Sequence, residues 1–179
     1  MNSSSHVDSL LASAISLKAS GDASVKSNDY QRAIAHYTKI FAYLNGLEPD
    51  QSTQAVLAMA GKSSNSSMGA EQKNKISELL LSTKSNLCLC YAKFNDFDKV
   101  ILYSSQILAS QPDHAKALFR RGSAYRSTRR FDESRADLMS AARLLPNDAG
   151  IRAELLKLKD SEIAEDEKMR KQFAGMFAQ

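Results

Sequence analysis

The chain has 179 residues, 43% of them hydrophobic and 25% charged, which is enough for one domain with a buried core. A formal charge of +4, from 24 basic and 20 acidic residues, is too mild an excess to indicate nucleic acid binding without a clustered patch. The sequence contains no run of about 18 apolar residues, so we predict no membrane span. Because the amino-terminal residues lack the basic region of a secretion signal, we expect a cytoplasmic protein with Cys88 and Cys90 reduced.

Apolar residues recur at helical spacing along most of the chain, so the sequence predicts an all-α fold. The residues at 1–6 are expected to form a disordered start. A segment rich in Ser, Gly and Asn, 48–70, is expected to be a flexible insertion. The predicted helices are 7–27, 30–46, 71–94, 97–110, 113–127, 131–144 and a capping helix within 146–179 whose charged end projects.

Two stretches of the chain repeat each other without a gap. Residues 91–114 overlay 125–148, and the shared landmarks keep one constant offset, since 125 minus 91 is 34. These landmarks are the pairs Tyr91 and Tyr125, Phe97 and Phe131, and Pro112 and Pro146. An earlier copy contains Gly21, Tyr30, Ala33 and Tyr37, and its offset from the second is almost doubled, since 97 minus 30 is 67. The small residues are expected to let two helices cross closely, while large ones fill the space between repeats.

This pattern and its offset resemble the tetratricopeptide repeat (TPR), whose period is about 34 residues. The resemblance implies three helix-turn-helix repeats, stacked as a short right-handed superhelix with a long C-terminal capping helix. We place the repeats at 7–47, 71–111, where the first helix is extended, and 112–145, with the capping segment at 146–179.

Five side chains are predicted to line the groove of such a stack. Lys18 and Asp22 lie one helical turn apart on the first helix, as do Lys116 and Arg120 on the first helix of the third repeat. Asn86 holds the same repeat position as Arg120, since 120 minus 86 is 34.

This set resembles the carboxylate clamp of chaperone-binding TPR domains, found in co-chaperones and large immunophilins. The stretch "AKALFRRGSAY" resembles their third-repeat helix, and "KQFAGMF" the end of the last helix in those immunophilins. "YLNGLEPD" points closer still, to the small stand-alone tetratricopeptide repeat domain 9 family. The resemblance implies a non-enzymatic adaptor that binds the acidic C-terminal carboxylate of an Hsp90- or Hsp70-type chaperone, without a cofactor or metal.

One position departs from the clamp pattern, because Asp22 stands where the family has Asn. An ionised Asp only accepts hydrogen bonds and would repel a bound carboxylate by about 1 kcal/mol in water. Asp22 could instead pair with Lys18, four positions before it. Three alternatives follow: carboxylate binding is weakened, the ligand brings a donor to Asp22, or the clamp no longer binds these tails and the groove takes an internal peptide segment or another protein.

Other interpretations of the basic residues stay open. Lys116 and Arg120 could be solvated charges on an exposed face. The four other arginines of this region are predicted to be surface charges; they are Arg121, Arg126, Arg129 and Arg130. The basic C-terminal helix could bind calmodulin or a membrane surface, against a capping role. The sequence contains no acid–base cluster that would support catalysis. The chain could also be the helical half of an immunophilin-like isomerase, and in that case the purified chain is expected to show no isomerase activity.

Overall fold

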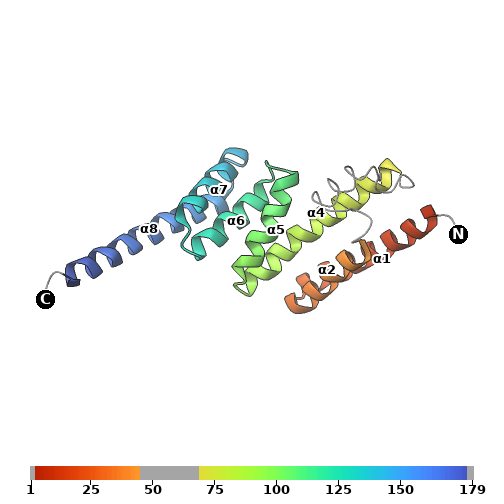
Figure 1. Ribbon diagram of the computed structural model, residues 1–179, viewed down its shortest axis with the longest axis horizontal. Coiled ribbons are helices and arrows are strands. Elements are labelled where there is room, and N and C mark those ends of the chain that lie inside the picture. Colours follow the sequence, from red (N-terminus) through yellow and green to blue (C-terminus); the bar gives the residue numbers. More distant parts are fainter. Residues whose placement is uncertain (1–2, 45–68, 177–179) are drawn as a thin grey trace, which may run out of the picture. The chain divides into compact units, whose positions relative to one another are not determined.

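The computed structural model describes residues 3–44 and 69–176, and within these ranges the chain is helical throughout and has no strand (Figure 1). The all-α prediction is therefore confirmed. The helices of the described ranges are α1 (Ser3–Lys26), α2 (Tyr30–Leu44), α4 (Ala70–Lys93), α5 (Phe97–Ser110), α6 (Ala115–Ser127), α7 (Phe131–Leu144) and α8 (Ala149–Met176). None of them is both long enough and apolar enough to cross a membrane.

The period of the sequence is visible in the backbone. Helices α5 and α7 each have 14 residues and begin one period apart, at Phe97 and Phe131. The turn before α2, α5 and α7 contains a residue in the left-handed region, and these residues are Asn28, Asn95 and Arg129, with φ of 60°, 56° and 61°. The same helix-ending turn therefore recurs in all three predicted repeats.

The chain divides into two compact units, and the first is Met1–Cys90. Helices α1 and α2 form a hairpin whose core contains fully buried Tyr37 and Ile40. Helix α4 joins this hairpin through a hydrogen bond of 2.6 Å from Gln72 Nε2 to Asp8 Oδ1 on α1. Asp29 caps α2, because its side chain accepts a bond from the backbone N–H of Arg32.

The second unit is Tyr91–Gln179. Helix α6 packs against α5 and α7, and α8 covers α7 and part of α6. Ile151 and Leu158 are buried on the first half of α8, whereas Ile163 and Phe173 further along are about half exposed. Figure 1 shows the last turns of α8 continuing past α6 and α7. The first half of the helix therefore caps the unit, and the second half projects.

The amino-terminal helix begins earlier than predicted. The disordered start is wrong for residues 3–6, which form the first turn of α1. Serine favours caps and turns, but Val7, Leu11 and Ala14 anchor α1 by burial, and extending an existing helix avoids the nucleation cost. Residues 48–68 of the predicted insertion lie outside the described residues, and α4 begins at Ala70.

Candidate peptide-binding site

In the first unit, close packing of α1 on α2 brings a tyrosine to the predicted site. A Cβ added to Gly21 would lie 2.5 Å from Tyr37 Cε1, so only glycine allows the ring to lie against α1 at this point. Asp22 is the next residue on α1, and Tyr37 Oη donates a hydrogen bond of 2.6 Å to its Oδ1. The helix crossing therefore fixes the position of a polar contact as well as that of the core.

Asp22 is the centre of a small network formed by three helices. Lys18, one turn earlier on α1, donates to Oδ2 at 2.7 Å. Asn86 on α4 donates from Nδ2 to Asp22 Oδ1 at 2.9 Å, and the same nitrogen donates to Tyr37 Oη at 3.1 Å. Because a carboxylate only accepts, the amide of Asn86 must present its nitrogen to Asp22. A single carboxylate thus holds together α1, α2 and α4.

These contacts determine the charge states in the network. Burial raises the pKa of Asp22, but the bonds from Lys18, Tyr37 and Asn86 outweigh it, and the pKa lies below its ordinary value. Burial, together with the neighbouring Asp22 carboxylate, raises the pKa of Tyr37. At neutral pH Asp22 is therefore ionised, and Tyr37 keeps the proton that it donates.

The network differs from the predicted role of Asn86. The sequence predicts that its amide donates to a ligand, whereas the structure directs it at Asp22 and Tyr37. The predicted pairing of Asp22 with Lys18 is present. Sequence reasoning missed Tyr37 as a polar residue of the site. The available signal is that Tyr37 follows Gly21 at the same spacing as Leu138 follows Gly122, and a buried tyrosine needs a hydrogen-bond partner.

In the second unit, Lys116 and Arg120 lie one turn apart on α6. His114 caps this helix, since its Nδ1 accepts from the backbone N–H of Ala117 at 3.1 Å. Lys116 is exposed and Arg120 is half-buried. Lys116 also lines a surface depression of about 570 Å³ between the start of α6 and Leu145. The two cations share one face of a well-capped helix, in a geometry that suits an acidic ligand.

Two arginines beside this pair are not the surface charges that were predicted. Arg121 makes two bonds, of 2.6 and 2.8 Å, to the buried carboxylate of Asp137 on α7. Arg126 bonds to buried Glu154 on α8 at 2.7 Å. The arginine prediction is therefore wrong for these two, because a buried acidic partner on the neighbouring helix draws each side chain inward. The available signal in the sequence is that Asp137 and Glu154 stand at positions where the helical pattern expects apolar residues, which indicates a buried acidic group in need of a basic partner.

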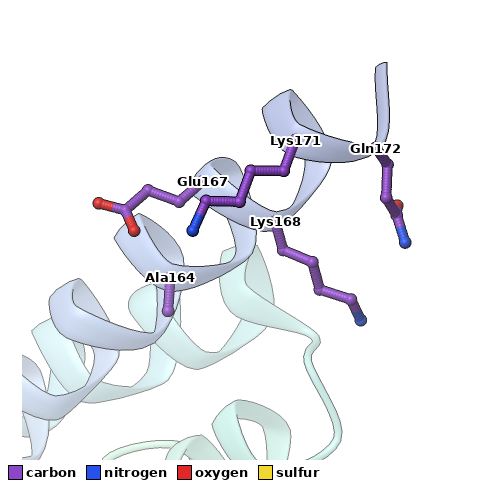
Figure 2. Close-up of a pocket in the computed structure, with 5 residues that line it drawn as sticks. All are labelled: Ala164, Glu167, Lys168, Lys171 and Gln172. Atoms are coloured by element: carbon purple, nitrogen blue, oxygen red, sulfur yellow. The ribbon is translucent and has the colours of Figure 1, made fainter. Parts of the chain in front are cut away.

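The projecting end of α8 carries a second depression, of about 410 Å³ (Figure 2). Ala164, Glu167, Lys168, Lys171 and Gln172 line it, and Figure 2 shows all five on successive turns of this one helix. A hollow between side chains of a single exposed helix has no enclosing wall, and it lacks the convergent polar groups of a ligand site. Calmodulin binding by this segment stays a prediction.

Comparison with known proteins decides the fold. No protein-family model matches the chain. The C-terminal TPR-containing domain of a Plasmodium falciparum FK506-binding protein superposes with a TM-score of 0.74 at 23% identity, over 90% of this chain and 95% of that one. The chain has a TPR fold. The first TPR of Spaghetti (RPAP3), solved with the Hsp90 peptide SRMEEVD, superposes with a TM-score of 0.60 at 20% identity, over 84% and 94%.

The TPR chain is also similar in sequence to a full-length immunophilin. It is 27% identical over 161 residues to peptidyl-prolyl cis-trans isomerase FKBP4 of Bos taurus, which covers 90% of this chain and 31% of that protein. The predicted resemblance to immunophilins is therefore confirmed. The chain spans about a third of that relative's length, and the isomerase activity in the name is the relative's. The closer resemblance to the tetratricopeptide repeat domain 9 family stays a prediction.

Proposed function

We propose that this TPR chain is a non-enzymatic adaptor that binds the acidic C-terminal tail of an Hsp90- or Hsp70-type chaperone. The observation that carries the proposal is the pair Lys116 and Arg120, one turn apart on α6 of a fold that also occurs in a TPR domain solved with an Hsp90 peptide. In the first unit, Lys18 is paired with Asp22. A cytoplasmic location belongs to the same proposal.

The chemistry of the pair supports an acidic peptide. Lysine offers a compact charge, and arginine a planar fork that matches a carboxylate. A charge-assisted hydrogen bond contributes about 1.5–3 kcal/mol, so a few such contacts, less the ordering of the peptide, correspond to affinity in roughly the micromolar range.

The proposal predicts that a labelled SRMEEVD peptide binds the chain and depends on both cations. Arg120→Ala or Lys116→Ala should weaken binding by at least about tenfold, because each loses a charge-assisted contact. Fluorescence anisotropy of the labelled peptide measures this. Lys159→Ala, which removes an exposed charge from α8, serves as the matched control and should leave the affinity within about twofold. Affinity unchanged by both α6 substitutions would contradict the proposal.

A second candidate is a scaffold that binds an internal segment of another protein. The observation in its favour is Asp22, whose carboxylate takes the bonds of Tyr37 and Asn86. In this alternative the chain binds partners without a free C-terminus in the site. An internal acidic segment and a chaperone tail then differ only in how much the terminal carboxylate adds to binding.

A further inference from the structure

The donor groups of the Asp22 network all have partners inside the protein. Tyr37 has one hydroxyl hydrogen, and its bond to Asp22 uses it. The amide of Asn86 donates from Nδ2 to both Asp22 Oδ1 and Tyr37 Oη, and these two oxygens lie only 2.6 Å apart. The neutral donor groups of this site are therefore directed at partners inside the protein. Lys18 gives one of its three hydrogens to Asp22.

What the site offers to a ligand follows from these contacts. The side chain of Asp22 is 37% exposed, so an approaching group meets its negative charge. A second carboxylate would find the donors of Asn86 and Tyr37 occupied and would be repelled by Asp22. The three donor groups form a carboxylate site, and the protein supplies the carboxylate itself.

We infer that Asp22 is a specificity-determining residue, which fills this carboxylate site from within and makes the terminal carboxylate of a bound peptide dispensable. The inference rests on the proposed function and defines its ligand class as acidic side chains rather than a chain end. Acidic side chains of the peptide, rather than its chain end, then account for its binding. An acidic segment should bind nearly as well with its end blocked as with its end free.

The test compares SRMEEVD as a free acid with the same peptide amidated at its C-terminus, using isothermal titration calorimetry. Wild-type chain should bind the two forms with affinities within about threefold, because the terminal charge meets no open donor set. Asp22→Asn removes the internal charge, frees Lys18 and adds an amide donor. It should bind the free acid at least about tenfold more tightly than wild type, with the amidated peptide changed by less than about threefold.

Two further variants make the result specific. Asp132→Asn removes the same charge from a side chain that is 98% exposed on α7, and it should change neither affinity. Asp22→Ala removes the carboxylate without adding an amide, and it should show the same preference for the free acid. Circular dichroism melts establish that each variant is folded at the temperature of the titration.

The outcomes separate the inference from the proposed function. Wild type that prefers the free acid by more than about tenfold overturns the inference and leaves the proposed function standing. Equal affinity of Asp22→Asn and wild type for the free acid does the same. If neither form binds wild type but the free acid binds Asp22→Asn, Asp22 closes the site rather than replacing the terminal carboxylate, and both the inference and the proposed function are overturned. If no variant binds either peptide, both are overturned.

Discussion

Tyr37 takes part in packing and in hydrogen bonding at the same time. Its ring is fully buried against Gly21, while its hydroxyl donates to Asp22. The corresponding contact in the third repeat joins Gly122 to Leu138, which has no polar atom on its side chain. One repeat position thus serves only packing in the second unit and serves both packing and the site in the first.

At this scale we predict that Gly21→Ala destabilises the protein more than Gly122→Ala. Alanine gains up to about 1 kcal/mol over glycine in a helix, but overpacking typically costs about 1–3 kcal/mol. A Cβ at position 21 would lie within 3.0 Å of three atoms of the planar Tyr37 ring, the nearest at 2.5 Å, whereas at position 122 the nearest atom is Leu138 Cγ at 2.8 Å. We expect net losses of about 2 and about 1 kcal/mol respectively, from denaturant unfolding.

A double variant checks the origin of the smaller loss. If the clash with Leu138 is its cause, Gly122→Ala combined with Leu138→Ala should lose less stability than the sum of the two single variants. Strictly additive losses would contradict the close contact.

Among the elements, the turns that end α1, α4 and α6 share one hydrogen-bond pattern. In the last of them Arg130 N–H donates to Tyr125 O at 2.8 Å, and Arg129 N–H donates to Arg126 O at 3.1 Å. This is the Schellman pattern, whose left-handed residue is favourable for Gly or Asn and strained for most others. Asn28 and Asn95 suit it, whereas Arg129 at φ 61° does not.

We therefore predict that Arg129→Asn stabilises the turn between α6 and α7. The exposed pair of Arg129 with Glu165 opposes this gain, so both chains under comparison carry Glu165→Gln. In that background the substitution should raise the free energy of unfolding by about 1 kcal/mol, by relief of left-handed strain. Thermal melts measure it, and a lower melting temperature would show that the arginine is not strained.

For the whole molecule, α8 is held to its unit by ion pairs as well as by apolar contacts. Three arginines of α6, α7 and the turn between them bond to glutamates of α8; the pairs are Arg126–Glu154, Arg129–Glu165 and Arg135–Glu162. Glu154 is buried, which raises its pKa, but the bond from Arg126 and further contacts outweigh burial, and the pKa lies below the ordinary 4.5.

This pKa predicts acid sensitivity of α8. A group whose pKa is lower in the folded state adds stability that is fully present above its unfolded pKa and is lost as the pH falls through the folded one. The unfolding free energy should therefore fall as the pH drops below about 4.5. Glu154→Gln, which cannot titrate, should fall less steeply between about pH 6 and about pH 3 in urea titrations. Equal slopes would show that Glu154 does not contribute to acid unfolding.

The repeat pattern predicts the elements of the fold well and the site only in part. The repeat register places the ends of α5, α6 and α7, because glycine, aromatic and proline positions report local helix packing. The hydrophobic periodicity does not determine the direction of a buried polar group, so it does not predict the hydrogen bonds of Tyr37 and Asn86 to Asp22. For the same reason the inward turn of Arg121 and Arg126 escapes a pattern based on hydrophobicity.

The network around Asp22 also has a consequence for how such a protein can change over generations. Replacing Tyr37 would cost packing, because its ring fills the space beside Gly21. Asn86 is held by its bonds to two partners. Aspartate and asparagine codons differ by a single base, so a point mutation at position 22 is enough to free the donor set while the packing stays intact. A single substitution, Asp22→Asn, would thus give the protein a preference for peptides with a free C-terminal carboxylate, and the reverse substitution would remove it.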